Sequence, residues 1–158
     1  MLIGQYKSKL TEKNRISVPK KIRDELGDEM VIAKWYEDCL VLVSSANWEK
    51  LLRRLIGKQE FVISSVRDID RFIMAGAFEV SLDGQGRFVL PEELIKYANV
   101  HDEIVFIGLG DRVEIWAEEA WRELEKSSED KAAKAIEKIA KEVLIDGQIK
   151  QKANGRKA

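Results

Sequence analysis

Hydrophobic and polar positions along this chain follow one pattern that occurs twice. In each copy a strand-like segment leads into a tight turn, a short segment of alternating apolar and polar residues, and a proline that opens a helix. Residues 10–19 and 82–91 align in this way at a constant offset of 72 positions. Because each half is too small to bury much apolar surface alone, we expect the halves to pair around a pseudo-two-fold axis and to share one β-core.

The first copy predicts a series of short elements. In chain order they are a strand at 3–10, a turn at 11–14, a strand at 16–18, a helix at 19–26, a hairpin of the apolar runs 30–33 and 39–43, and a helix with an apolar stripe that begins at Trp48 and ends at Gly57. A further helix is expected at about 64–75, with Val66, Ile69, Phe72 and Ile73 on its inward face.

The second copy repeats the series and then departs from it. In chain order its elements are a strand at 76–82, a turn at 83–86, a strand at 87–90, a helix at 91–98, a hairpin at 103–108 and 112–116, and a helix that carries Trp121. Ser127 and Ser128 predict the cap of another helix at about 129–145, and the basic segment from Gly147 has too little apolar surface to fold. We therefore divide the chain into a first repeat (1–58), a linking helix (59–75), a second repeat (76–124), a C-terminal helix (125–146) and a flexible basic tail (147–158).

The composition of the 158 residues is that of a globular protein with many charged side chains on its surface, since 45% of the residues are hydrophobic and 35% are charged. The apolar runs are too short to span a membrane, and residues 1–4 lack the basic start and apolar core of a signal peptide. Cys39 stands alone, so no disulfide and no cysteine metal site is expected. These features favour a cytoplasmic protein without cofactor, metal or membrane partner.

The distribution of charge distinguishes the two copies more than the overall net charge of −1 does. The window from Lys7 to Arg23 holds seven cations against one acid and carries +6, whereas the matching window from Glu79 to Ile95 holds one cation against four acids and carries −3. DNA is a dense line of negative charge, so the first copy is the better candidate to face it.

Basic side chains in and around the two turns are the candidate DNA contacts. A guanidinium can donate two hydrogen bonds to O6 and N7 of guanine in the major groove, whereas lysines suit phosphates. The candidate DNA-binding residues are Arg15, Lys13, Arg87, Lys7, Lys9, Lys20 and Lys21. Asn14, Gly86 and Asp83 are expected to set the geometry of the turns, because Asn and Gly tolerate a left-handed backbone at the equivalent position.

Each of these assignments has a structural alternative. A basic stretch is often only a solvated surface, and an arginine behind an aspartate-bearing turn is often a structural ion pair, which applies to Arg87 with Asp83. Arg15 has Thr11 in the place of that acid, so it is freer to reach outward. The Thr11 hydroxyl can still accept a backbone N–H and preserve the turn.

Several motifs together resemble a known family. The turn–arginine–strand–proline motif occurs twice, glycine-led strands begin near residues 3 and 75, and the segment from Arg112 to Trp116 precedes the second tryptophan helix. Over about residues 1–124 the chain resembles the MraZ family, bacterial regulators within the AbrB/SpoVT-like superfamily. The family pattern is an Asp, then three residues, then an Arg. The second copy keeps this pattern with Asp83 and Arg87, whereas the first copy has Thr11 in the place of the Asp.

The resemblance implies both a fold and a function. The fold is of the α+β class, a duplicated swapped-hairpin (AbrB/SpoVT-like) β-barrel with flanking helices and an added C-terminal helix, which assembles into ring-like homo-oligomers. The partner is double-stranded DNA at the nucleoid. The implied function is transcription control through direct repeats of a short G-rich box upstream of the division and cell-wall gene cluster, including the chain's own promoter.

The sequence also bears on two other classes of function. An enzyme is not expected, because the single His and the single Cys lie in unrelated settings and no GxSxG, Walker or zinc-binding spacing occurs. An AbrB-like antitoxin or an oligomeric protein-binding scaffold stays as the alternative. Antitoxins of that kind usually carry one swapped-hairpin copy, whereas this chain carries two.

Overall fold

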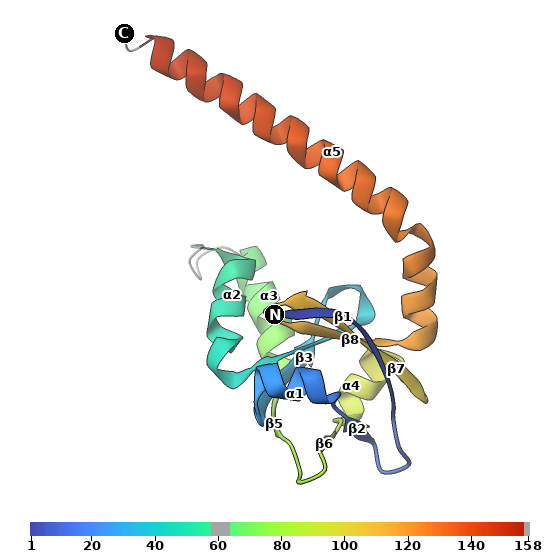
Figure 1. Cartoon of the computed structure of the whole chain (residues 1–158). Coiled ribbons are helices and arrows are strands. Elements are labelled where there is room, and N and C mark those ends of the chain that lie inside the picture. Colours follow the sequence, from blue (N-terminus) through green and yellow to red (C-terminus); the bar gives the residue numbers. More distant parts are fainter. Residues whose placement is uncertain (58–63, 157–158) are drawn as a thin grey trace. The chain divides into compact units, whose positions relative to one another are not determined.

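The computed structural model describes residues 1–57 and 64–156, and the chain divides into two compact units, Met1–Glu118 and Glu119–Ala158. The strands of the first unit are β1 (Leu2–Lys9), β2 (Arg15–Ser17), β3 (Glu29–Lys34), β4 (Leu40–Ser44), β5 (Ala77–Ser81), β6 (Arg87–Val89), β7 (Glu103–Gly110) and β8 (Val113–Ala117). Its helices are α1 (Lys20–Leu26), α2 (Trp48–Ile56), α3 (Ser64–Ala75) and α4 (Glu92–Tyr97), with 3-10 turns η1 (Tyr36–Asp38) and η2 (Ser45–Asn47) (Figure 1). Helix α5 (Glu118–Arg156) begins at the last residue of the first unit and makes up the described part of the second.

Strands from the two halves are interleaved in the first unit. Six antiparallel strands form one sheet in the order β1-β7-β8-β4-β3-β5, so β1 of the first half lies on a hairpin of the second half and β5 of the second half lies on a hairpin of the first. The remaining two strands, β2 and β6, form a separate two-stranded ribbon. The fold is therefore α+β with an antiparallel sheet, as expected.

The two halves share one apolar core, which confirms the expectation from their small size. Its most buried members come from both copies and include equivalent pairs such as Val18 with Leu90 and Ile22 with Leu94, all at most 2% exposed. Removing this surface from water is the main force that holds the interleaved strands together, because neither half has a core of its own.

The short helices and hairpins follow their sequence signals closely. Pro19 lies at the N-cap of α1, where its missing N–H costs little, and Gly27 ends the helix with φ 79°. The predicted hairpins are β3–β4 and β7–β8.

The inward face predicted for α3 is only half right. Val66 and Ile73 are buried, as expected from their spacing on one face. Ile69 and Phe72 are 37% and 43% exposed, and the Phe72 ring meets the Tyr97 ring edge-on at 5.8 Å. Residues 58–63, where the linking helix was expected to begin, lie outside the described residues.

The prediction for the C-terminal segment is wrong in two respects. One helix, α5, runs unbroken from Glu118 to Arg156, so there is no boundary at Ser127 and Ser128 and no unstructured tail at 147–156; residues 157–158 of that tail lie outside the described residues. The two serine hydroxyls donate to the carbonyls of Leu124 and Glu125, at 3.4 and 2.9 Å, instead of capping a new helix.

Helix α5 carries a stripe of apolar residues that is exposed. Ile136, Ile139 and Val143 are 67%, 59% and 63% exposed. Within the described part of the chain, no helix combines the length and the apolar character needed to cross a membrane.

Candidate nucleic-acid interface

The two turns have the same backbone hydrogen bonds. Thr11 N–H donates to the Arg15 carbonyl at 3.0 Å, and Asp83 N–H donates to the Arg87 carbonyl at 2.8 Å. A second pair closes each turn, from Asn14 N–H to the Thr11 carbonyl and from Gly86 N–H to the Asp83 carbonyl, both at 3.0 Å. The departure from the family pattern at Thr11 has therefore not changed the turn.

Each turn also depends on one residue in the left-handed backbone region and on a bond to the other turn. Asn14 has φ 56° and Gly86 has φ 76°, as their residue types predicted. The Asn14 carbonyl accepts a hydrogen bond from Leu90 N–H at 2.6 Å, and the Gly86 carbonyl accepts one from Val18 N–H at 3.0 Å. These reciprocal bonds bring both turns to one end of the unit, the lower end in Figure 1.

The β2–β6 ribbon places both candidate arginines on one outer face. Ile16 pairs with Phe88 and both are buried, so the flanking pairs, Arg15 with Val89 and Ser17 with Arg87, point away from the core. Arg15 and Arg87 then occupy diagonal positions, and Val89 between them is 55% exposed. A two-stranded ribbon is one of the shapes that the major groove admits.

The arginines differ in what stands beside them. Arg87 Nε lies 3.2 Å from Asp83 Oδ2, and the same carboxylate accepts the backbone N–H groups of Gln85 and Arg87. The hydrogen bond from Arg87 N–H, followed by that from Gln85 and the Arg87 charge, holds the pKa of Asp83 below its ordinary value. The ion pair that the sequence left open for Arg87 is therefore present.

Arg15 has a hydroxyl in the place of that carboxylate. The Thr11 hydroxyl accepts the Arg15 backbone N–H at 3.3 Å and so preserves the turn without neutralising the guanidinium. Among the described residues, no carboxylate lies within ion-pair distance of Arg15. Arg15 is half-buried and belongs to the outer face of the ribbon.

Arg23 is a neighbour of the second turn that the sequence did not single out. A Cβ on Gly86 would lie 2.4 Å from Arg23 Nη1, so this arginine of α1 packs directly against the turn of the other copy. The equivalent position in the second copy, 72 residues further on, holds the apolar Ile95. Because the two halves are interleaved, Arg23 of the first copy lies beside the turn of the acidic second copy.

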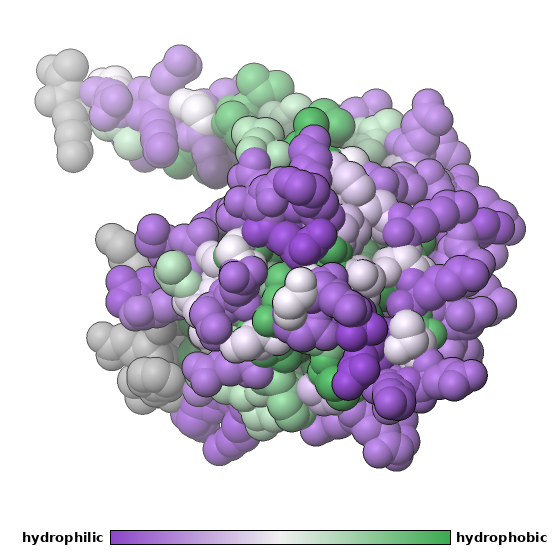
Figure 2. Space-filling view, turned by 60° about the horizontal axis from the view of Figure 1, so that its bottom comes forward, coloured by the Kyte–Doolittle hydropathy of each residue, from purple (hydrophilic) through white to green (hydrophobic). Residues whose placement is uncertain are grey.

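The five candidate lysines fall into two groups. Lys13 lies in the first turn, and Lys20 and Lys21 begin α1 directly after β2; all three are exposed, and Lys20 Nζ contacts Asp24 at 2.8 Å. Lys7 and Lys9 lie further back along β1 beside acids: Lys7 Nζ contacts Glu118 at 3.3 Å, and Lys9 is opposite Glu103 in the strand register. The first group is better placed for phosphates than the second. Figure 2 turns this end of the unit forward and shows mainly hydrophilic residues there.

Comparison with known proteins identifies the family. The MraZ family model, described as "MraZ protein, putative antitoxin-like", matches residues 1–72 and 73–148. A Transcriptional regulator MraZ from Clostridium acetobutylicum is 42% identical over 82% of this chain and 91% of its own length. Proteins of the same name from Syntrophomonas wolfei and Caldicellulosiruptor saccharolyticus are 37% and 39% identical, over 92% and 88% of this chain and 98% and 99% of their own lengths. The chain belongs to the MraZ family of transcriptional regulators.

The two family copies begin at residues 1 and 73 and so reproduce the 72-residue offset of the turns. In this member of the MraZ family, two of the four acids that make the second window negative contact lysines. Glu92 contacts Lys96 Nζ at 3.6 Å on α4, and Glu93 pairs with Lys34, which is only 21% exposed. The negative charge of the second copy is thus partly neutralised.

The groups on which an enzyme assignment would depend lie in separate environments. Cys39 is buried, and burial raises the pKa of its thiol far above the ordinary value. His101 is exposed in the connection between α4 and β7. The MraZ relatives are named as transcriptional regulators.

Proposed function

We propose that this chain regulates transcription by binding double-stranded DNA sequence-specifically through the outer face of the β2–β6 ribbon. The observation that carries the proposal is the placement of Arg15 and Arg87 on that face, with the Arg15 guanidinium unneutralised. Lys13, Lys20 and Lys21 lie next to the ribbon in the chain and supply phosphate contacts, which give affinity but carry no sequence information.

The register of the ribbon suits a run of guanines. Diagonal positions on a two-stranded ribbon are about 7–8 Å apart, which is about two steps of the DNA helix at about 3.4 Å per step. Arg15 and Arg87 can therefore reach two nearby bases in the same groove, and arginine to guanine is the commonest specific contact there. This geometry supports the short G-rich box as the target, with Arg15 as the principal reader of the bases.

A single ribbon covers few phosphates, so we propose that affinity comes from several protomers on repeated boxes. The family resemblance suggests a ring-shaped homo-oligomer, boxes upstream of the division and cell-wall genes, and location at the nucleoid. The interleaving of β1 with β7, β5 with β3 and β2 with β6 supports the swapped-hairpin barrel as the fold that presents each ribbon.

The test is footprinting of the region upstream of the chain's own gene over a range of salt, followed by titration of boxed and scrambled DNA. Successive boxes should lie about 10 base pairs apart, so that neighbouring protomers face one side of the helix. Inserting about half a helical turn between boxes should weaken binding. Unchanged affinity after the insertion would contradict the multi-protomer arrangement.

Charge-changing variants next to the ribbon and in the acidic copy test the phosphate contacts. Lys20→Glu with Lys21→Glu should weaken binding to boxed and scrambled DNA alike and flatten the salt dependence. Glu92→Lys is the control, because Glu92 is exposed and belongs to the acidic copy. Glu93→Lys is a poor control, since it would place a cation against half-buried Lys34.

A protein-binding role remains the second candidate, because the family description includes the term antitoxin-like. The exposed apolar stripe of α5 is the surface that such a partner would cover. Co-expression with the product of a neighbouring toxin-like gene, with toxicity as the readout, distinguishes this role from promoter binding.

A further inference from the structure

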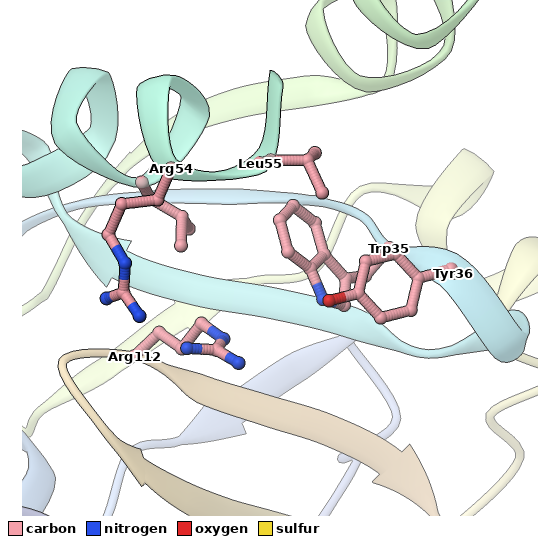
Figure 3. A pocket seen from close by; sticks show the side chains of 6 residues that line it. Trp35, Tyr36, Arg54, Leu55 and Arg112 are labelled. Atoms are coloured by element: carbon pink, nitrogen blue, oxygen red, sulfur yellow. The ribbon is translucent and has the colours of Figure 1, made fainter. Parts of the chain in front are cut away.

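Side chains at the surface of the first unit differ in whether the protein itself supplies their partners. Arg54 and Arg112, which line a depression beneath α2, both contact the Asp111 carboxylate. In the same depression the Tyr36 ring packs against the Trp35 indole, with centroids 4.8 Å apart (Figure 3). Both arginines and the tyrosine therefore have partners within the chain.

Val89 is an apolar side chain on a charged face. It is 55% exposed on the outer face of the β2–β6 ribbon, where it is paired with Arg15 and follows Arg87 by two positions on its own strand. The inner face of the ribbon is filled by the buried pair of Ile16 and Phe88. Val89 thus places an isopropyl group between two arginines, on the face that we assign to DNA.

The register brings the Val89 side chain close to that of Arg15. Leu90 N–H donates to the Asn14 carbonyl at 2.6 Å, so the neighbouring pair of Arg15 and Val89 is of the non-hydrogen-bonded kind. In such pairs the Cβ atoms lie at the short end of about 4.5–5.5 Å. Because successive base pairs are about 3.4 Å apart, a group that touches Val89 belongs to a base pair one or two steps from the one that Arg15 contacts.

The two copies differ at this position. Val89 has its equivalent 72 residues earlier in Ser17, which is also exposed. The outer face therefore carries an arginine from each copy but an apolar group from the second copy alone. That apolar group lies opposite Arg15, the arginine whose turn holds a hydroxyl in place of a carboxylate. Such an asymmetric face fixes the direction in which a box is read.

The chemistry of the major groove specifies what an isopropyl group can recognise. The base edges present hydrogen-bond donors and acceptors there, and the thymine C5-methyl is the apolar group among them. A valine side chain can neither donate nor accept, so packing it on a polar edge would leave that edge without water and without a partner. The methyl group carries no such cost.

We propose that Val89 packs on the C5-methyl group of a thymine one or two base pairs from the guanine that Arg15 contacts. This inference rests on the proposed function, since it requires the ribbon to lie in the major groove. The surrounding cations Lys13, Lys20 and Lys21 suit the phosphates on either side of that contact. Removing one methyl group from water makes the contact worth about fourfold in affinity for each engaged protomer.

The test uses the full-length protein and a duplex with two boxes located by footprinting, titrated by fluorescence anisotropy. Each thymine in one box and in the two base pairs on either side of it, on both strands, is replaced singly by deoxyuridine. This replacement keeps the Watson–Crick pair and removes only the methyl group. One replacement should weaken binding by about fourfold, and the others should change it little.

Variants at the two equivalent positions assign the effect to Val89. Val89→Ser installs the residue type of the first copy and should bind the thymine and deoxyuridine duplexes equally. Val89→Ile keeps an apolar branched side chain and should keep the fourfold ratio. Ser17→Ala is the matched control, because it changes an exposed side chain on the same face of the ribbon and should leave the ratio as in the parent chain. A ratio of two affinities is insensitive to any uniform loss of folded protein.

The outcomes separate this inference from the proposed function. Loss of the ratio in Val89→Ser alone supports the contact. A parent chain that binds the boxed duplex with no response to any methyl group, or a box without thymine, would overturn the inference and leave DNA binding intact. An unchanged ratio in Val89→Ser would also overturn it, because the methyl group would then act through the shape of the DNA. Absence of binding to the boxed duplex would overturn both.

Discussion

The first and second turns have one backbone and two different surroundings. Their hydrogen bonds match pair for pair, yet Arg87 lies against the Asp83 carboxylate and Arg15 against the Thr11 hydroxyl. The Asn14 side of the ribbon is exposed, whereas Gly86 is buried under Arg23. The same loop geometry thus presents a free cation in one copy and a neutralised one in the other.

This difference shows that backbone geometry and charge are separable in a duplicated motif. The turn needs an oxygen that accepts backbone N–H groups, and both a hydroxyl and a carboxylate supply it. Only the hydroxyl leaves the arginine unpaired. This difference supports the proposal that Arg15 is the principal reader of the bases and that Arg87, held by Asp83, contributes less.

The largest effect is expected from Arg15→Ala. Each bidentate base contact is worth about 1–3 kcal/mol, so specific binding should fall by roughly fivefold to 150-fold for each engaged protomer. Fluorescence anisotropy with boxed and scrambled DNA measures this loss, with oligomer size checked for the variant. Arg87→Ala is the paired control and should lose less. Loss of specificity in Arg87→Ala with normal binding by Arg15→Ala would contradict the larger contribution of Arg15.

Exchanging the acceptors between the turns should transfer the difference. Thr11→Asp supplies the bonds that Asp83 makes and pairs Arg15, so affinity for boxed DNA should fall by roughly fivefold or more, the scale of one charge-assisted hydrogen bond. Asp83→Thr frees Arg87 and removes a negative charge, so binding to scrambled DNA should rise. Opposite changes in the two titrations confirm the idea, and a fall in both variants would refute it.

A smaller effect on stability should distinguish the two left-handed positions. Gly86→Ala combines a positive φ with a Cβ that meets Arg23, and should lower the free energy of unfolding by about 1–3 kcal/mol. Asn14→Gly keeps the backbone conformation and should change it little. Urea denaturation of both variants measures the difference. Equal stability of Gly86→Ala and the parent chain would show that Arg23 and the turn adapt freely.

The smallest effect concerns pH. The folded pKa of Asp83 is below its ordinary value of 3.8, so its charged form stabilises the fold above that pH and this contribution is lost as pH falls through the folded pKa. Asp83→Asn keeps an oxygen acceptor but removes the charge. Its destabilisation should be present at about neutral pH and shrink below pH 3.8. Urea denaturation midpoints of the variant and the parent chain, measured at neutral pH and below pH 3.8, test this. A difference between the two midpoints that did not change with pH would be inconsistent with the carboxylate as its source.

Parts of the site's geometry could be predicted from the sequence, because the two family copies begin 72 residues apart and Asn14 and Gly86 both have a left-handed backbone. The offset of 72 residues, the paired arginines and the turn residues were all visible in the printed chain. The ion pair of Arg87 was foreseen as an alternative, since Asp83 lies four residues away. Arg23 was not foreseen, because its neighbour Gly86 is 63 positions further along the chain.

The sequence by itself determined the local elements, because hydrophobic periodicity, prolines and turn residues act over a few neighbouring positions. It could not determine that β1 pairs with β7, that β5 pairs with β3, or that Asp111 joins Arg54 to Arg112. It also predicted a break in α5 at Ser127, where the hydroxyl bonds back to its own helix. Those outcomes depend on burial and on partners far away in the chain, which only the tertiary structure brings together.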